Sequence, residues 1–307
     1  MEYANISKGL QNLGNTCFFN SVLQMLFQCT VLNKLIIEND IDGTLIDIYK
    51  QYLNSYLNPN ESSICSPNMI VQYVSKLLGR RGWAQEDADQ YITFIIDCII
   101  DEFKEWHKKT SDLVVLNKSI TVDELIESLF TIKCMKELIC PSCDYVSKTN
   151  DDINKLYLSI DNDNNDNNNK PMSFDDLINK YLYESLDSDN QWKCDKCNDM
   201  VEANIKRTIN KFPKYLIVTL KRYANNNKKL GCEIDMPMIF SHPITNKQFH
   251  MRGFIYHSGS TGGGHYVYYG NKKDKWYLYN DSSVSNISNE QINNIKKTGY
   301  IYLYVSK

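Results

Sequence analysis

The pattern of apolar residues in this chain changes from helical to strand-like near residue 130. Before that point, AQEDADQYITFIIDCIIDEFKEW places apolar residues at steps of three and four from Ala88 to Phe103, which predicts a long amphipathic helix. Helices that are segregated from strands predict an α+β fold with an antiparallel sheet. The strand-like runs, rich in β-branched and aromatic residues, are LYLSI (156–160), YLIVTLKRY (215–223), FHMRGFIYHSG (249–259), HYVYYG (265–270), KWYLYND (275–281) and YIYLYVS (300–306).

Composition and charge narrow the class of protein further. With 307 residues and 42% hydrophobic content the chain can bury a sizeable core, and its net charge of −3 gives no reason to expect a nucleic-acid or membrane partner. No run approaches the roughly 18 uncharged apolar residues of a membrane-spanning helix, and MEYANISKGL lacks the pattern of a secretory signal. We therefore expect a cytoplasmic or nuclear protein whose ten cysteines are reduced thiols or metal ligands.

Four cysteines form two Cys-x-x-Cys pairs in the strand-rich part. Cys140 and Cys143 make the first pair, and Cys194 and Cys197, beyond a gap of 50 residues, make the second. A two-residue spacing lets both thiolates of a pair face one ion, so two pairs complete the tetrahedral set that structural Zn²⁺ prefers. The alternatives are four thiols without metal and a redox pair, but neither pair opens a helix after a strand. The sequence therefore predicts a zinc site that stabilises a small two-stranded projection.

GLQNLGNTCFFNSVLQML, residues 9–26, places a cysteine where a glycine-containing turn passes into a helical pattern. Cys17 falls in the first turn of this predicted helix, with Asn15 or Thr16 as the candidate N-cap. Free backbone N–H groups and the positive end of the helix dipole favour a thiolate there and can receive a developing oxyanion. Asn12 lies across the turn and is a candidate to donate a side-chain N–H to the same oxygen. The alternative is that Cys17 is a small core residue.

A nucleophilic cysteine needs a general base, and one of the five histidines has suitable surroundings. His265 follows the GSTGGG segment and opens the HYVYYG strand, which leaves room for a substrate backbone beside its ring. Asn280 and Asp281 end the next strand, and in a hairpin they return beside the start of the previous one. Either is a candidate to orient the imidazole in a papain-like Cys/His/Asn arrangement. The alternative is an ordinary turn, where Asn and Asp are common.

Together these segments resemble the ubiquitin-specific protease family from Gly9 to the last predicted strand. The sequence around Cys17 resembles the family's cysteine box, and GGGHYVYYG with KWYLYNDSSVS resembles its histidine box. QEDADQYITFIIDCI is similar to the family's Gln-x-Asp-Ala helix, and DNQWKCDKC, EANIKRTINKFPKYLIVTLKRY and IYHSG follow in the family's order. The combination is far more specific than any single motif.

The resemblance implies one papain-like catalytic domain over residues 1–307 with a thumb–palm–fingers architecture. It implies a helical thumb over about 1–130, zinc-ribbon fingers with part of the palm over about 131–215, and a palm sheet over about 216–307. The implied activity is that of a deubiquitinase, a thiol-dependent hydrolase of the isopeptide or peptide bond after the C-terminal glycine of ubiquitin. A monomer that holds a structural Zn²⁺ and acts on ubiquitin and ubiquitinated proteins is therefore expected.

By the same resemblance, Cys17 is the nucleophile, His265 the general base and acid, and Asn280 the third member of the triad. Asn12 matches the oxyanion-hole asparagine, and Asp281 is implied as an alternative third member. A second set of residues is implied to contact the ubiquitin tail, namely Gln85, Asp87, Gly263, Gly264 and Tyr266.

Some positions depart from the family pattern and leave rivals open. Gln90 and Tyr91 stand where Glu and Phe are usual, and Tyr223 replaces the common Phe after Lys-Arg. An uncharged Asn280 stabilises an imidazolium less than Asp does, which predicts slower turnover. The rivals are a catalytically weak ubiquitin-binding scaffold, a protease for a related ubiquitin-like modifier and a zinc-ribbon nucleic-acid binder. The filled triad positions argue against the first, and the acidic charge balance argues against the last.

Overall fold

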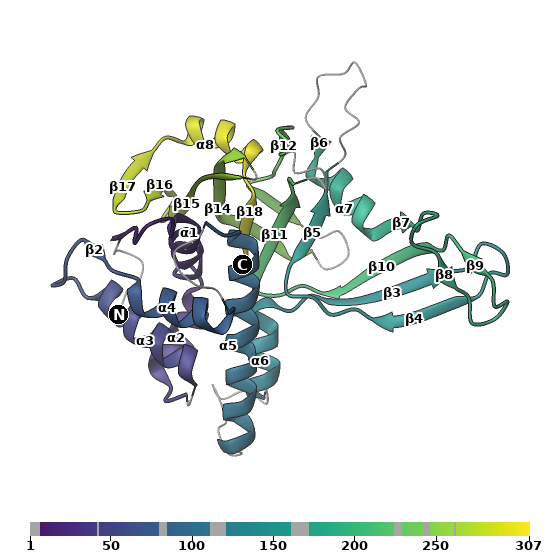
Figure 1. The fold of residues 1–307 in the computed structure, drawn as a ribbon, viewed down its shortest axis with the longest axis horizontal. Helices are drawn as coiled ribbons and strands as arrows, with labels where there is room; N and C mark the ends of the chain where they lie inside the picture. The colour runs from purple at the N-terminus through teal and green to yellow at the C-terminus, as the bar shows by residue number, and fades with distance from the viewer. Residues whose placement is uncertain are drawn as a thin grey trace.

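The structure is a computed structural model that describes residues 7–41, 43–79, 85–110, 121–160, 172–223, 229–241, 246–260 and 262–307. Its elements are arranged like a hand (Figure 1): a helical thumb, a palm sheet and a long narrow sheet, the fingers, that projects to one side. The α+β class predicted from the sequence is confirmed, since helices fill the first part of the chain and strands dominate the rest. Among the residues that the structure describes, no helix is long and apolar enough to cross a bilayer.

The thumb is built around α1, all of whose residues are buried. A helix that is buried on every side needs neighbours all round. Helix α1 (Cys17–Leu26) lies between α5 (Ala88–Thr110) and three palm strands, β14 (Gln248–Ser260), β15 (Gly263–Lys272) and β16 (Lys275–Asn280). The core face of α5 follows the predicted steps, with Ile92, Ile95 and Ile99 fully buried. The thumb helices are α1 (Cys17–Leu26), α2 (Thr30–Glu38), α3 (Thr44–Leu57), α4 (Asn68–Leu77), α5 (Ala88–Thr110) and α6 (Val122–Phe130).

The palm is a sheet with the strand order β17-β16-β15-β14-β18-β11-β5, and β13 also pairs with β14. Each of the six predicted strand runs forms a strand of this sheet. The expectation of a purely antiparallel palm is wrong at one edge, because β5 pairs with β11 in the parallel direction. Parallel neighbours need a long crossover connection, and here most of the fingers lie between the two strands. The palm strands are β5 (Leu156–Ser159), β11 (Tyr215–Lys221), β13 (Ile239–Ser241), β14 (Gln248–Ser260), β15 (Gly263–Lys272), β16 (Lys275–Asn280), β17 (Ser283–Ile287) and β18 (Ile301–Ser306).

The face of the palm opposite the thumb has its own hydrophobic core. Phe174 and Leu177 of α7 and Ile292 of α8 pack there with side chains from the strands. Two short strand pairs lie outside the palm and finger sheets, one between β1 and β2 beside the thumb and one between β6 and β12. The bounds of these elements are β1 (Gly9–Leu10), β2 (Ile64–Cys65), β6 (Met172–Ser173), α7 (Phe174–Leu182), β12 (Ile234–Asp235), α8 (Asn289–Ile295) and the 3₁₀ turn η3 (Lys296–Thr298).

The fingers are a narrow antiparallel sheet in the order β4-β3-β10-β7, with the β8–β9 hairpin near the tip (Figure 1). The expectation of a two-stranded projection is wrong, because β4 and β7 flank β3 and β10 in this sheet. A narrow sheet of this kind still buries little apolar surface, so the projection has only a small core of its own. That core contains Cys140, Cys194, Val201 and Ala203. The strands are β3 (Lys133–Ile139), β4 (Val146–Asn150), β7 (Tyr183–Ser185), β8 (Trp192–Lys193), β9 (Met200–Val201) and β10 (Asn204–Lys211).

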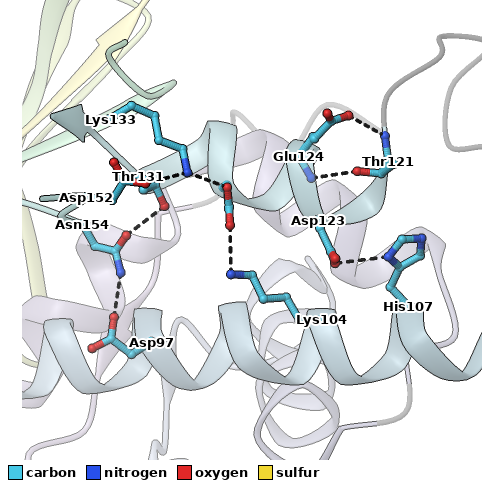
Figure 2. A network of polar contacts seen from close by, with 11 residues as sticks. Asp97, Lys104, His107, Thr121, Asp123, Glu124, Thr131, Lys133, Asp152 and Asn154 are labelled. Carbon is cyan, nitrogen blue, oxygen red and sulfur yellow. Dashed lines mark hydrogen bonds and ion pairs between the residues drawn. The ribbon is translucent and has the colours of Figure 1, made fainter. Parts of the chain in front are cut away.

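A polar network fastens the base of the fingers to the thumb, as Figure 2 shows. Glu127 of α6 accepts hydrogen bonds from Lys104 of α5 at 2.9 Å and from Lys133 of β3 at 2.8 Å. The hydrogen bond from Lys133, and after it the one from Lys104, lowers the pKa of the Glu127 carboxyl group. His107 Nδ1 lies 3.2 Å from Asp123 Oδ1 further along the same two helices. The network therefore joins α5, α6 and β3 at one junction.

Candidate active site

The turn before α1 is built by the side chain of Asn12. Its Oδ1 accepts hydrogen bonds from the backbone N–H groups of Gly14 at 2.9 Å and Thr16 at 3.2 Å. Gly14 and Asn15 have φ values of +95° and +55°, the left-handed region that these two residue types adopt most readily. Thr16 is the N-cap residue, and Cys17 is the first residue of the helix. The Asn-x-Gly-Asn-Thr-Cys sequence thus fixes both the turn and the position of the thiol.

Cys17 is almost completely buried, with 3% of its surface exposed. Burial raises the pKa of its thiol above the ordinary value, while the backbone N–H of Tyr266 acts in the opposite direction. The charge of Asp281 raises this pKa further. Desolvation therefore outweighs the expected preference of a helix start for a thiolate, and in this geometry a base has to remove the thiol proton.

His265 and Asn280 meet across the hairpin of β15 and β16, as predicted from the spacing of the two strands. Nε2 of His265 lies 2.7 Å from Oδ1 of Asn280. Because an amide oxygen only accepts, Nε2 carries the hydrogen and Nδ1 is left as the acceptor of the ring. Tyr266, the next residue, brings its backbone N–H to the sulfur of Cys17. The strand that carries the imidazole therefore lies against the start of α1.

Asp281 lies in the same turn but contacts different residues. Its carboxylate accepts hydrogen bonds from Asn12 Nδ2 at 2.7 Å and from Asn20 Nδ2 at 2.8 Å, and its backbone has a φ of +47°. The structure thus brings Asn280, and not Asp281, to His265. Asn20 was not predicted as a site residue, although its position one helical turn after Cys17 places it on the same end of α1.

A groove of about 340 Å³ runs between the start of α5 and strands β14 and β15. Four members of the predicted tail-binding set line it, namely Gln85, Asp87, Gly263 and Tyr266. The carboxylate of Asp87 accepts hydrogen bonds from the hydroxyl of Tyr300 at 3.0 and 2.9 Å. Burial raises the pKa of the Asp87 carboxyl group. Tyr266 joins the groove to the thiol, because its side chain lines the groove while its backbone contacts Cys17.

Gly264 packs closely against the neighbouring strand β14 beside this groove. A Cβ atom at this position would lie 2.1 Å from the carbonyl oxygen of Ser258 and 2.3 Å from Nε2 of His257, so only glycine fits. Gln85 spans the groove to the same residue, since its Oε1 accepts from the Gly264 N–H at 3.1 Å and its Nε2 donates to the Gly264 carbonyl. The backbone edge of β15 is thus available for hydrogen bonding from within the groove.

Two further groove residues were not predicted as functional. His257, with 4% of its surface exposed, lies 2.6 Å from the hydroxyl of Tyr223 through Nδ1. Burial, with the nearby charges of Lys229 and His265, lowers the pKa of His257 to about 4, so its ring is neutral at pH 7. The signal in the sequence was the pairing of the IYHSG and HYVYYG strands, which sets His257 opposite Tyr266.

The four predicted metal ligands lie together at the tip of the fingers. Their sulfur atoms are all within 4.8 Å of one another. The Sγ atoms of Cys140 and Cys197 are 3.8 Å apart, and those of Cys143 and Cys194 are 3.7 Å apart. Bonds of about 2.3 Å to a tetrahedral zinc ion place sulfur ligands about 3.8 Å apart. The four cysteines therefore have the donor set and spacing of a metal site.

The two Cys-x-x-Cys loops have the same backbone geometry. In the first, Asp144 follows the second cysteine with a φ of +55°, and its N–H donates to the carbonyl of Cys140 at 3.0 Å. In the second, Asn198 has a φ of +62°, and its N–H donates to the carbonyl of Cys194 at 2.9 Å. Two loops of one shape that face each other are the arrangement expected of a zinc ribbon.

A helical lobe that carries a buried cysteine and a sheet that carries a histidine, with a groove between them, define a protein of the papain-like hydrolase class. A family model described as "Ubiquitin carboxyl-terminal hydrolase" matches residues 8–304. The chain therefore belongs to the ubiquitin carboxyl-terminal hydrolase family, whose members are deubiquitinating enzymes of the cysteine type. The resemblance to the ubiquitin-specific proteases and the assignment to the deubiquitinases are confirmed at the level of the family.

Relatives and a solved structure agree with this family. The chain is 26% identical to the probable ubiquitin carboxyl-terminal hydrolase 16 of Schizosaccharomyces pombe, over 100% of this chain and 69% of the relative. It is 25% identical to ubiquitin carboxyl-terminal hydrolase 2 of Homo sapiens, over 92% of this chain and 53% of the relative. A structure of Ubp8 in the SAGA DUB module, with Sgf11, Sus1 and Sgf73 and bound to monoubiquitin, superposes with a TM-score of 0.74 at 22% identity. That comparison covers 100% of this chain and 70% of the other, and it supports the thumb–palm–fingers fold.

Proposed function

We propose that this chain hydrolyses the isopeptide or peptide bond after the C-terminal glycine of ubiquitin. The observation that carries the proposal is the 2.7 Å contact between His265 and Asn280, on a strand whose next backbone N–H contacts Cys17. Membership of a family of deubiquitinating hydrolases supplies the reaction class. The chain spans about half the length of the human relative, so its substrate and activity are proposed here from the site.

In the proposed reaction His265 Nδ1 accepts the thiol proton of Cys17 as the sulfur attacks the carbonyl carbon of the ubiquitin glycine. The tetrahedral intermediate collapses when the carbon–nitrogen bond breaks and the imidazolium returns its proton to the departing amine. A water molecule then gives a proton to His265 and attacks the thioester, which releases the ubiquitin carboxyl group and restores the thiol. Asn280 holds the ring so that Nδ1 is the nitrogen that takes up and gives back the proton in each step.

Asn12 is the proposed side-chain donor to the oxyanion, together with backbone N–H groups at the start of α1. Its carboxamide has two N–H bonds and an oxygen. The oxygen is held by Gly14 and Thr16, and Nδ2 contacts Asp281 at 2.7 Å. One N–H of Asn12 therefore remains for the substrate oxygen, and we assign Asp281 the role of a positioning residue for Asn12 rather than of a third triad member.

The groove beside Cys17 is the proposed site for the ubiquitin tail. The palm side of this groove carries Gly262 and Gly263, and a stretch of wall without side chains leaves room for an extended tail that ends in Gly-Gly. The backbone groups of Gly264 that Gln85 now contacts are suited to pair with an extended peptide. The Ubp8 structure, which is bound to monoubiquitin, supports ubiquitin as the partner.

A structural Zn²⁺ is the proposed occupant of the four-cysteine cluster, held by Cys140, Cys143, Cys194 and Cys197. Bound there, the ion joins the two loops at the tip of the fingers and takes no part in the hydrolysis. None of the ten cysteines is in a disulfide, which supports a reducing compartment, the cytoplasm or nucleus, as the location. We further propose that the chain acts as a monomer, without a nucleic-acid or membrane partner.

Cleavage of a ubiquitin C-terminal fluorogenic amide by the wild type and by Cys17→Ala tests the proposal, with the ubiquitin affinity of both measured in parallel. The expected result is hydrolysis by the wild type only and ubiquitin binding by both. Binding without hydrolysis by the wild type would identify a scaffold instead. Faster cleavage of the corresponding substrate made from a ubiquitin-like modifier would show that this modifier, and not ubiquitin, is the substrate.

A further inference from the structure

A second cavity, of about 700 Å³, lies where the palm meets the turn between α1 and α2. It is lined by Phe27, Gln28 and Thr30 beyond the end of α1, and by Lys272 at the end of β15. The thiol and the imidazole lie at the opposite ends of that helix and that strand. With about 1.5 Å of rise per residue, the ten residues of α1 place this cavity about 15 Å from Cys17. It is therefore separate from the substrate groove.

The lining of this cavity, which we call the basic cavity, is strongly cationic in a chain whose net charge is −3. Its lysine and arginine residues are Lys214, Arg252, Lys272, Lys273 and Lys307. His250 adds a group that can take a proton, and the acidic residue in the lining is Asp274. A concentration of one sign of charge in a hollow focuses the electric potential and attracts ions of the opposite sign.

Three of these cations have no carboxylate partner. Within the ranges that the structure describes, no ion pair is formed by Lys214, Arg252 or Lys307. The Nζ of Lys214 is instead hydrogen-bonded to a backbone carbonyl, that of Ser306, at 2.6 Å. Lys307 and Arg252 also act on His250, whose pKa is lowered by burial and then by these two charges. Like charges gathered in one hollow repel one another, and a bound anion relieves that repulsion.

A β-bulge places Arg252 in the cavity. Its neighbours Met251 and Gly253 pair with consecutive residues of β18, so Arg252 is the extra residue without a partner in that strand. A bulge redirects the side chain of the extra residue and is commonly found next to binding sites. Among the described residues, the Arg252 guanidinium group forms no hydrogen bond, so its five N–H donors remain for a ligand.

Two further nitrogen atoms in the lining lack partners among the residues that the structure describes. Nε2 of Gln28, a donor, and Nε2 of His250 are buried and form no hydrogen bond there. A buried polar atom without a partner destabilises the folded state, so Gln28 calls for an acceptor from a ligand, and His250 offers a second donor when its Nε2 carries the hydrogen. The helix α2 also begins at the cavity wall, at Thr30, and its positive end adds to the attraction for an anion.

We propose that the basic cavity binds a small anion that carries several phosphate groups, such as an inositol polyphosphate or a nucleoside triphosphate. The volume is that of a small-molecule site, and the planar guanidinium with neighbouring lysines matches phosphate oxygens. Its concave shape favours a compact ligand over an extended nucleic acid. The proposal is independent of the hydrolase activity, since it involves none of the groove residues.

Calorimetric titration of the full chain at low salt, with inositol hexakisphosphate, with ATP and with inorganic phosphate in separate experiments, tests the proposal. We expect one of the two polyphosphates to bind at micromolar concentration, and inorganic phosphate to bind at least 100-fold more weakly. Arg252→Gln and Lys307→Ala should each weaken the binding at least fivefold. Lys76→Ala, which removes an exposed lysine from α4, is the matched control and should leave the binding unchanged.

Comparing the affinities for inositol hexakisphosphate and for ATP shows whether the cavity prefers an inositol polyphosphate or a nucleoside triphosphate. Melting temperatures of the variants report on folding, and Lys307→Ala at the exposed chain end keeps the test valid if Arg252→Gln does not fold. Absence of binding by both polyphosphates below 1 mM would overturn the proposal. Equal weakening by all three variants would overturn it as well, because that result indicates general charge attraction.

Discussion

Nε2 of His265 lies 2.7 Å from Oδ1 of Asn280, while the neighbouring Asp281 accepts hydrogen bonds from Asn12 and Asn20. Two consecutive residues of one turn therefore contact different parts of the site. The first is next to the proposed general base, and the second is next to the proposed oxyanion donor. Substitutions at the two positions should consequently affect different kinetic properties.

Asn280→Asp should raise the turnover number by a few-fold. A carboxylate orients the imidazole as the carboxamide does and in addition stabilises the imidazolium that forms during attack. The measurement is kcat for a ubiquitin C-terminal fluorogenic amide. Asn286→Asp, an exposed position on the adjacent β17, is the control for the added charge. A slower Asn280→Asp enzyme would show that the neutral partner is preferred here.

Asn12→Ala should lower kcat by roughly 100-fold, since loss of one oxyanion donor costs a factor of this order. KM should change little, because the hydrogen bond forms in the transition state. Asp281→Ala should lower kcat by a smaller factor, because the side chain of Asn12 is then no longer held in place by a hydrogen bond to Asp281. In the Asn12→Ala background the Asp281 substitution should then have almost no further effect. Fully multiplicative effects of the two substitutions would contradict the positioning role.

Acidification should destabilise the fold through His257. The pKa of this buried histidine is about 4, against 6.5 for an ordinary histidine. Between these values the unfolded chain binds a proton that the native chain does not, so the free energy of unfolding falls as the pH falls from 6.5 towards 4. Urea unfolding at pH 7 and pH 5 measures this. The loss should be smaller in His257→Gln, and an equal loss in both proteins would refute the assignment.

The fingers should depend on a bound metal. The purified protein is expected to contain one zinc ion per chain, and Cys197→Ser should lose the zinc and have a lower melting temperature. Cys232→Ser, which changes a thiol outside the cluster, should keep the bound zinc and the melting temperature of the wild type. Elemental analysis gives the metal content. Equal zinc content in the two variants, or none in the wild type, would rule out the proposed site.

The sequence predicted the α+β class and the strand runs well because each run has a strong two-residue alternation or apolar pattern of its own. The contact between His265 and Asn280 was also predictable. In a hairpin, a residue at the end of the second strand lies beside a residue at the start of the first strand. The parallel pairing of β5 with β11 was not predictable, because it depends on how the fingers return to the palm. The contact of Asp281 with Asn12 was missed because it joins the two ends of the chain.

The effect of burial on the pKa values of Cys17 and His257 could not be predicted from the sequence either. The position of Cys17 at a helix start suggested an acidic thiol, but its pKa is raised by the surrounding palm strands and helices. The low pKa of His257 likewise arises from burial between the β strands and the groove wall. Such shifts depend on tertiary packing, which a local motif does not encode.

In the proposed reaction the sulfur of Cys17, activated by His265, attacks the end of the ubiquitin tail. Ubiquitin with a thiol-reactive electrophile at its C-terminus tests this attack, with mass spectrometry to locate the adduct. We expect one adduct at Cys17 in the wild type, none in Cys17→Ala and a much slower reaction in His265→Ala. An adduct at another cysteine, or undiminished labelling of Cys17→Ala, would contradict it.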